Sequence, residues 1–263
     1  MSYAEIVYEV NGAVAKITLN RPEKRNPLGP NTIGELLHAL DAAKADDGVR
    51  VIVLTGAGKV FSAGGDLSSM GSGGTPLQAT GGVSTKPGTF VDLNLALTTV
   101  GKPTIAMVNG HALAGGLGLV VACDFALAAD DAQLGTPEIN VGLWPMMIMA
   151  TIFRNVPRKR GLELVATGDK ISAAEAASMG LITRAVPKDQ LATEVQALAD
   201  KLASKSPAVM RLGLDAFHKT EDLPLQPALE YLQGQLMAVL GLEDAREGLM
   251  AFMEKRPPVW KGR

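Results

Sequence analysis

Two glycine-rich stretches, GAGKVFSAGGDL at 56–67 and HALAGGLGLV at 111–120, could do chemistry with backbone amides rather than with side chains. Each follows an apolar, strand-like run, turns through glycine and opens a helix. The first N–H groups of a helix have no partner within it, and the helix dipole favours negative charge there. Glycine lets a ligand approach such a backbone closely. Two such turns that converge would aim a pair of N–H donors at one oxygen, which makes an oxyanion hole.

Two nucleotide-binding motifs fit these glycines less well. The stretch at 56–67 lacks the Gly-Lys-Ser/Thr step that a phosphate-binding loop needs for its lysine and its magnesium ligand. The stretch at 111–120 does not follow the G-x-G-x-x-G pattern of dinucleotide-binding folds, and it does not belong to the first βα unit. Tight packing against a neighbouring helix remains an alternative for either stretch taken alone.

The elements that must position these turns indicate an α/β fold. An Asn11-Gly12 turn between two β-rich runs predicts a hairpin. Apolar residues at helical spacing predict a helix within 27–45, with Asn31 as its N-cap. Strands that alternate with helices favour a layered α/β structure. The predicted strands are 5–10, 13–19, 49–56 and 102–110.

From about residue 158 the sequence becomes helical. Ser172 and Glu175 have the spacing of a capping box, and Gly180 marks the end of that helix. Apolar stripes predict three further helices, at 188–207, 208–220 and 224–256. We therefore expect an α/β core over 1–195 and a helical C-terminal oligomerisation region over 196–263.

Composition narrows the class of protein. The 263 residues are 47% hydrophobic, and 25 Lys and Arg against 27 Asp and Glu give a net charge of −2. This balance offers no general attraction to nucleic acid or to anionic membranes. The single cysteine, Cys123, excludes an intrachain disulfide framework. With no signal peptide and no membrane span in the sequence, we expect a cytoplasmic protein.

Metal chemistry has no support in the sequence, because no ligand pattern for zinc or calcium is present. His218 lies on a predicted helix without acidic or cysteine partners at metal-binding spacing. We expect it to be a surface or packed histidine. Cys123 and Asp124 are expected to end the helix that the glycines open.

The glycine stretches and their surroundings closely resemble the enoyl-CoA hydratase/isomerase (crotonase) family. The resemblance rests on GAGKVFSAGGDL, on KPTIAMVNGHALAGGLGLVVACDFALAADDAQLGTPEINVGLWP, on TGDKISAAEAASMGLITRAVP and on FMEKRPPVW, and it covers essentially the whole chain. It implies a spiral of ββα units with a helical C-terminal trimerisation region, assembled as a homotrimer or a dimer of trimers. It also implies an acyl-CoA thioester as substrate. Coenzyme A would be part of that substrate, so no separate cofactor is expected.

Site residues carried over from this family follow the same motifs. Gly65 and Gly115 would supply the two amides of the oxyanion hole, and Glu138 in GTPEINVG would be a general acid/base. Substrate-binding residues would include those that border the thioester and the adenine, and a lysine that in relatives reaches the coenzyme A phosphates of an adjacent subunit. These are Ala63, Asp66, Leu67 and Lys255.

One departure from the family pattern concerns the chemistry directly. Relatives that hydrate an enoyl-CoA usually carry a second glutamate three residues after the second oxyanion glycine, and this sequence has Gly118 there. Moving a double bond needs one base that removes a proton and returns it elsewhere, whereas two carboxylates readily share the addition of water. We expect Gly118→Glu to fold unless Trp144 or Met146 fills the space, and to favour hydration.

The acyl pocket also departs from the usual pattern. Where many relatives have small residues, this chain has GLWPMMIMATIF. Trp144 is therefore expected to bind the acyl group, and Met146, Met147 and Met149 to reshape the pocket, with helix packing as the alternative for Met149. The glycine-rich stretch 71–88 is expected to be a lid that forms another wall.

These observations predict an enoyl-CoA hydratase or isomerase that stabilises an enolate in an oxyanion hole and uses one glutamate as general acid/base. The alternatives are dehydration or decarboxylation of another acyl-CoA, and a noncatalytic relative that binds acyl-CoA or RNA. Glu138 argues against the noncatalytic acyl-CoA binder. The balanced charge and the 4% aromatic content argue against the RNA binder.

Overall fold

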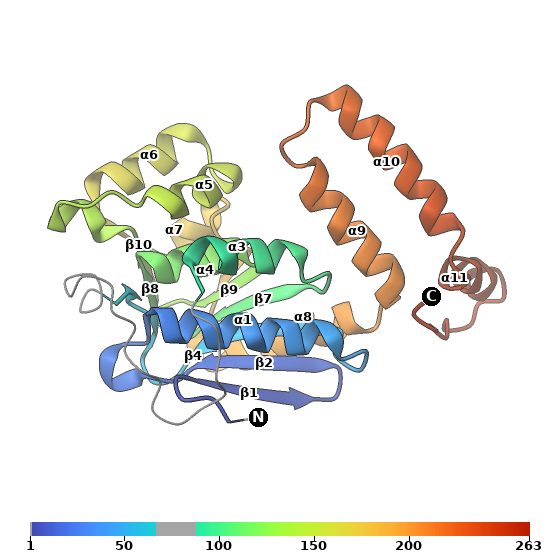
Figure 1. The fold of residues 1–263 in the computed structure, drawn as a ribbon, viewed down its shortest axis with the longest axis horizontal. Helices are drawn as coiled ribbons and strands as arrows, with labels where there is room; N and C mark the ends of the chain where they lie inside the picture. Colours follow the sequence, from blue (N-terminus) through green and yellow to red (C-terminus); the bar gives the residue numbers. More distant parts are fainter. Residues whose placement is uncertain (1, 67–87) are drawn as a thin grey trace.

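The predicted N-terminal hairpin is confirmed and forms the edge of a mixed sheet in the computed structural model, which describes residues 2–66 and 88–263 (Figure 1). Its two strands pair around Gly12, whose φ of 57° lies in the left-handed region that favours glycine. Within the described residues this sheet has six strands in the order β1-β2-β4-β7-β9-β12, and all pairs after β1-β2 are parallel. Its strands are β1 (Ile6–Asn11), β2 (Val14–Leu19), β4 (Val51–Gly56), β7 (Thr104–Val108), β9 (Phe125–Ala129) and β12 (Arg184–Val186).

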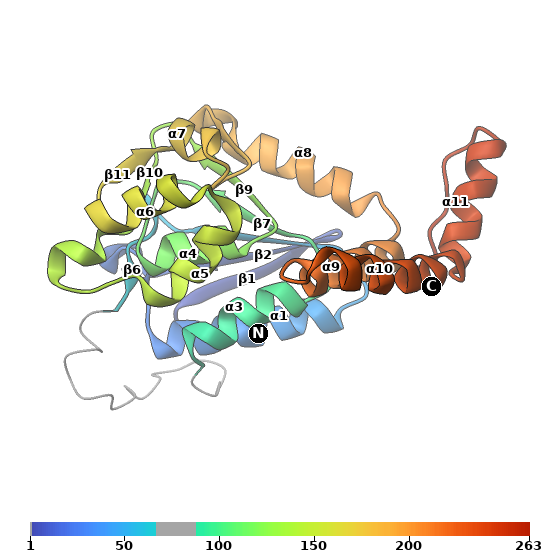
Figure 2. The ribbon, with the colours of Figure 1, turned by 90° about the horizontal axis from the view of Figure 1, so that it is seen from above.

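Helices cover both faces of this sheet, as its apolar composition requires. All residues of β4 are buried, which is typical of a parallel strand. Figure 2 shows α1 (Pro30–Ala45) and α8 (Leu191–Ala203) on opposite sides of the sheet. The prediction of Asn31 as N-cap of the first helix is wrong, because Gly29 is the N-cap and Pro30 takes the first helical position. Proline suits that position because its φ is already helical and its missing N–H is not needed there.

A smaller sheet carries the glycine-rich turns. Among the described residues it has the order β11-β10-β8-β5, and β5, β8 and β10 run parallel. A two-stranded pair, β3 with β6, adjoins it. These strands are β5 (Val60–Ser62), β8 (His111–Leu113), β10 (Gln133–Gly135), β11 (Lys170–Ser172), β3 (Pro27–Leu28) and β6 (Gly64–Gly65).

The remaining helices of the core connect these strands. They are α3 (Phe90–Thr99), α4 (Gly115–Ala122), α5 (Met146–Asn155), α6 (Arg158–Thr167) and α7 (Ala173–Ser178), with short 3₁₀ turns η1 (Pro22–Lys24), η2 (Pro137–Val141) and η3 (Lys188–Gln190). Ser172 caps α7, because its side chain accepts the N–H of Glu175 at 3.1 Å. The other half of the predicted capping box is replaced, because the Glu175 side chain accepts from Arg160 at 2.6 Å. No helix among the described residues is both long and apolar enough to cross a membrane.

Three helices extend from the core at the C-terminal end (Figure 1). They are α9 (Pro207–Thr220), α10 (Leu225–Leu240) and α11 (Glu243–Met253). The prediction of one helix over 224–256 is wrong, because the chain turns at Gly241 and Leu242. Asp244 explains the turn, since its buried carboxylate binds the Ser206 hydroxyl at 2.6 Å and the N–H of Lys261 at 2.7 Å. The expected domain boundary at 195 falls inside α8, which packs against the larger sheet.

Candidate active site

Three parallel strands of the smaller sheet end side by side, and each predicted catalytic residue follows one of them. Ser62 of β5 pairs with Ala112 of β8, and Leu113 of β8 pairs with Gly135 of β10. The chain then continues from β5 to Gly64-Gly65, from β8 to Gly115, and from β10 to Glu138. The carboxyl ends of parallel strands are where α/β proteins commonly bind ligands. The topology therefore brings the two glycine turns and Glu138 to one sheet edge.

The two glycine turns touch each other. A Cβ added to Gly115 would lie 3.6 Å from the backbone nitrogen of Gly65, and one added to Gly64 would lie 3.0 Å from the nitrogen of Gly115. Gly64 also has a φ of +98°, which side-chain-bearing residues rarely adopt. Position 64 therefore requires glycine, both because of its φ and because the two backbones approach each other there.

The amides of Gly65 and Gly115 lie next to each other at the sheet edge. Gly115 is the first residue of α4, so its N–H has no partner within that helix. On the other turn, the N–H of Asp66 donates to the carbonyl of Leu28 in β3. Because successive peptide groups of a strand point to opposite sides, the N–H of Gly65 is directed away from β3. The arrangement can therefore present two backbone donors to one oxygen.

Ala114, between β8 and α4, holds a strained backbone. Its φ of 51° and ψ of −131° lie in a region that is essentially reserved for glycine, at a cost of about 1–3 kcal/mol. Two hydrogen bonds fix this conformation: its N–H donates to Gly135 O at 2.9 Å, and its carbonyl accepts the Gly118 N–H at 3.1 Å. The strain is therefore stored directly before the Gly115 amide.

A buried network that the sequence did not reveal holds the first glycine turn. The Ser62 hydroxyl accepts the Gly64 N–H at 3.1 Å and donates to the Asn26 carbonyl at 2.7 Å. Asn26 has a φ of 54°, and its side-chain amide donates to the carbonyls of Ala57 and Val60. Asparagine tolerates the left-handed region better than most residues. This tolerance is the one property of the sequence that points to the role of Asn26.

Glu138 has the environment of a proton-transfer group. It lies in η2, and its backbone carbonyl accepts the N–H of Leu143 at 3.0 Å. Its Oε2 atom is buried and has no hydrogen-bond partner among the residues that the structure describes. This burial raises the pKa of the Glu138 carboxyl above its ordinary value. A carboxyl of this kind can hold and release a proton closer to neutral pH than an exposed one.

The space beside Gly118 is filled, but not by the residues suggested from the sequence. A Cβ added to Gly118 would collide with Ile148 Cγ2 of α5 and would lie 2.9 Å from Phe90 Cζ of α3. Met146 is instead 66% exposed, and the Trp144 indole N–H faces the Met149 sulfur at 3.4 Å. The steric obstacle to Gly118→Glu is therefore formed by Ile148 and Phe90 rather than by Trp144 or Met146.

Predicted substrate-binding residues lie partly at this edge. The Ala63 N–H donates to Arg25 O at 2.9 Å, and Asp66 lies 3.8 Å from Arg21, so both border the first glycine turn. Leu67 and residues 71–87 of the expected lid lie outside the described residues. Trp144 is partly buried and packs against the core.

Lys255 does not meet the site within one chain. It is exposed just beyond α11, and α11 lies on the side of the molecule opposite β8 (Figure 1). Any contact between Lys255 and this sheet edge therefore needs a second copy of the chain.

His218 has an acidic partner that sequence spacing could not show. Its Nε2 lies 3.1 Å from Asp124 Oδ1 across the contact between α9 and the core. That hydrogen bond raises the pKa of His218. Within the described residues no group of three or more His, Cys, Asp or Glu could hold a metal ion.

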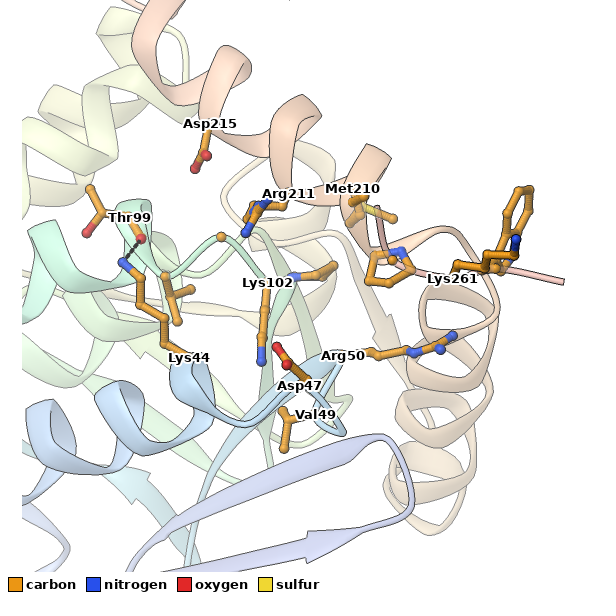
Figure 3. Close-up of a pocket in the computed structure, with 17 residues that line it drawn as sticks. Lys44, Asp47, Val49, Arg50, Thr99, Lys102, Met210, Arg211, Asp215 and Lys261 are labelled. Atoms are coloured by element: carbon orange, nitrogen blue, oxygen red, sulfur yellow. Dashed lines mark hydrogen bonds between the residues drawn. The ribbon is translucent and has the colours of Figure 1, made fainter. Parts of the chain in front are cut away.

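A cavity of about 470 Å³ lies away from the sheet edge, where α1, α3 and α9 meet (Figure 3). Three of its cations are engaged with carbonyls at the ends of helices. Lys44 donates to Thr99 O at 2.7 Å, Lys102 to Ala43 O and Asp46 O at 2.6 Å each, and Arg50 to Ala203 O at 3.1 Å. Cations stabilise helix C-termini in this way. None of the predicted site residues lines this cavity.

Comparisons with known proteins agree with the resemblance seen in the sequence. A sequence model of the family described as enoyl-CoA hydratase/isomerase matches residues 9–263. A Thermus thermophilus protein provisionally named as an enoyl-CoA hydratase is 38% identical over 247 residues, which are 94% of this chain and 97% of that protein. Carnitinyl-CoA dehydratase of Escherichia coli is 35% identical over 259 residues, covering 96% of this chain and 97% of the enzyme. The crystal structure of human enoyl coenzyme A hydratase domain-containing protein 3 superposes with a TM-score of 0.90 at 32% identity, over 98% of this chain and 100% of the human one.

Proposed function

The chain belongs to the enoyl-CoA hydratase/isomerase family, and from this premise we propose that its sheet edge binds an acyl-CoA thioester through the N–H groups of Gly65 and Gly115. The support is the contact between the two glycine turns, which leaves no room for a side chain at position 64 beside the Gly115 nitrogen. Negative charge develops on the thioester oxygen when a proton leaves the α-carbon. Preorganised backbone donors stabilise that charge and so make the α-carbon more acidic.

Glu138 moves the proton in this proposal. The observation that carries it is the buried Oε2 atom, which has no partner among the described residues and whose burial raises the carboxyl pKa. In a 3-enoyl-CoA the Glu138 carboxylate takes a proton from the α-carbon, and the electrons pass into a dienolate. The same carboxyl then returns the proton to the γ-carbon, which gives the 2-enoyl isomer. No atom is gained or lost, and no cofactor besides coenzyme A in the substrate takes part.

Isomerisation is the reaction that the geometry supports best. Ile148 and Phe90 pack where a carboxylate at position 118 would lie, so one proton-transfer group serves the site. Hydration is the second candidate, because a relative from Thermus thermophilus carries the hydratase name and the Escherichia coli relative is a dehydratase. One carboxyl could both take a proton from water and deliver it to carbon in a cyclic arrangement.

Assembly into a homotrimer or a dimer of trimers completes the proposal. Helix α10 has no buried residues, and its apolar side chains recur at helical spacing along one stripe. These side chains are Leu225, Leu229, Leu232, Leu236 and Leu240, each of them exposed. A second copy of the chain would cover this stripe and would bring Lys255 to the coenzyme A of its neighbour. We propose the cytoplasm as the compartment, which cell fractionation can test.

The experiment that tests this function is incubation with a panel of 2-enoyl- and 3-enoyl-CoA thioesters. Products are identified by mass and by the position of the double bond. Isomerisation leaves the mass unchanged and moves the double bond, whereas hydration adds one water. A protein that neither converts nor binds any acyl-CoA of the panel would contradict the proposed function.

A further inference from the structure

Phe90 and Ile148 form a wall over the face of α4 that carries the Gly115 amide. The Phe90 ring spans this face, because its Cε2 lies 3.6 Å from a Cβ added to Gly115 and its Cζ lies 2.9 Å from one added to Gly118. Ile148 closes the same face from α5 and is only 4% exposed. We call Phe90 and Ile148 the plug.

Both side chains of the plug are held by their own helices. Phe90 is the first residue of α3, where Thr89 and Asp92 form a complete capping box. The Phe90 carbonyl also accepts the side-chain N–H of Asn94 at 2.8 Å. Ile148 belongs to the buried face of α5 together with Ile152. The plug is therefore a fixed part of the fold.

A groove of about 560 Å³ lies beyond the plug, at the far end of α4. Its lining includes Val121 and Ala122, which follow Gly118 by about one helical turn. The same helices that supply the plug also supply much of the groove, through α3 residues 91–98 and α5 residues 147–155. The plug thus separates the Gly115 amide from the groove along one helix.

The chemistry of the groove suits an apolar chain. Large apolar side chains on its walls are exposed to solvent: Val91, Leu95, Met147 and Phe217. Four of its charged or titratable side chains form two pairs, since Arg154 lies 2.6 Å from Asp222 and His218 lies 3.1 Å from Asp124, and Glu221 also lines the groove. The groove therefore offers apolar contact area without an unpaired charge among these four side chains.

We propose that the plug sets the length of the acyl group, so that this protein accepts short acyl-CoA thioesters and excludes longer ones from the groove. The inference rests on the proposed function, which puts the thioester carbonyl at Gly65 and Gly115. From Gly115 to Ala122 the helical rise of 1.5 Å per residue gives about 10 Å. An acyl chain that follows α4 meets Ile148 and Phe90 at Gly118, well before it reaches the groove.

The test measures the affinity of the full-length protein for saturated acyl-CoA thioesters, which bind without reacting. The ratio of the affinity for a ten-carbon chain to that for a four-carbon chain is determined by calorimetry. Ile148→Ala is expected to raise this ratio by about tenfold or more. A change of one methylene group in an apolar pocket alters selectivity between substrates by about this factor. Ile152→Ala is the matched control, because Ile152 is buried on the same helix but does not line the groove. It is expected to leave the ratio unchanged.

A second substitution tests whether the ten-carbon acyl chain enters the groove. Ala150 is exposed and lines the groove, so Ala150→Phe in the Ile148→Ala background is expected to cancel the gain. Ala150→Phe alone is expected to leave the four-carbon affinity as it is. Phe90→Leu, at a partly exposed position, provides the same test if Ile148→Ala does not fold.

The possible outcomes distinguish the proposed function from the proposed role of the plug. A parent protein that binds no acyl-CoA would overturn the proposed function and the plug with it. A parent protein that binds four- and ten-carbon chains equally well would overturn the plug alone. An unchanged ratio in both Ile148→Ala and Phe90→Leu would do the same, and the proposed function would stand.

Discussion

Ile148 occupies the space that a side chain at Gly118 would need. The contact joins α5 to α4, and Phe90 of α3 approaches the same position from the other side. The family resemblance assigns this position to a second carboxylate, and in this chain Ile148 and Phe90 fill the space that its side chain would need. Replacing glycine by glutamate alone therefore does not restore the missing group.

Gly118→Glu is expected to be less stable than the parent protein. Glutamate is a better helix former than glycine by up to about 1 kcal/mol, but overpacking costs about 1–3 kcal/mol and the new carboxylate is buried. Urea unfolding gives the free energies for Gly118→Glu, Ile148→Ala and the double variant. We expect the two substitutions to be coupled, with the double variant more stable than the sum of the single effects predicts. Strict additivity would show that Ile148 is not the obstacle.

Gly64→Ala is expected to lose most of its activity on acyl-CoA thioesters. The new methyl group would lie 3.0 Å from the Gly115 nitrogen, and the φ of +98° disfavours any side chain. The two amides would be forced apart, so we expect turnover to fall by about a hundredfold or more, which is the effect of removing one oxyanion donor. Gly213→Ala on α9 is the control, because nothing lies within 4 Å of its added Cβ. Retained turnover in a folded Gly64→Ala protein would remove this turn from the site.

Leu236→Glu is expected to weaken assembly. Leu236 is 57% exposed in the single chain and lies in the apolar stripe of α10. Ala238, two residues on, lies about 200° around the helix, so Ala238→Glu adds the same charge on the other side. Sedimentation would show smaller species for Leu236→Glu and not for Ala238→Glu. If both variants keep the assembly of the parent protein, α10 does not form the interface through this stripe.

The free energy of unfolding is expected to depend on pH through the ionisation of Glu138. Burial raises the pKa of this carboxyl above 4.5 in the folded state, so the folded protein binds more protons than the unfolded chain between 4.5 and the raised value. The free energy of unfolding therefore falls as pH rises through this window. Glu138→Gln lacks the ionisation and is expected to be more stable than the parent protein at neutral pH, with a smaller difference in acid.

The control for this pH dependence is Glu9→Gln, at an exposed position of β1. Urea unfolding at several pH values measures both variants. A Glu138→Gln protein that is less stable than the parent protein at neutral pH would mean that the carboxylate has a favourable partner in the folded state.

The parts of the fold that follow local rules could be predicted from the sequence. The Asn11-Gly12 hairpin depends on backbone conformation, which residue type reports directly. The turn before α4 does not follow this rule, because Ala114 and not a glycine takes the positive φ there. The Ile148 contact with Gly118 and the Asp124 contact with His218 could not be predicted, because residues distant in sequence make them. The break at Gly241 could not be predicted for a similar reason, since Asp244 binds Ser206 and the C-terminal segment.

The central claim is that Glu138 transfers the proton of an α-carbon acidified by the Gly65 and Gly115 amides. Its most direct measurement is the exchange of the α-hydrogen of a bound acyl-CoA with deuterium from heavy water, followed by mass spectrometry. We predict that the parent protein exchanges this hydrogen and that Glu138→Gln, with unchanged acyl-CoA affinity, exchanges it about 10² to 10⁴ times more slowly, the usual contribution of a positioned acid/base. Exchange by Glu138→Gln within about threefold of the parent rate, far below that contribution, would contradict the account.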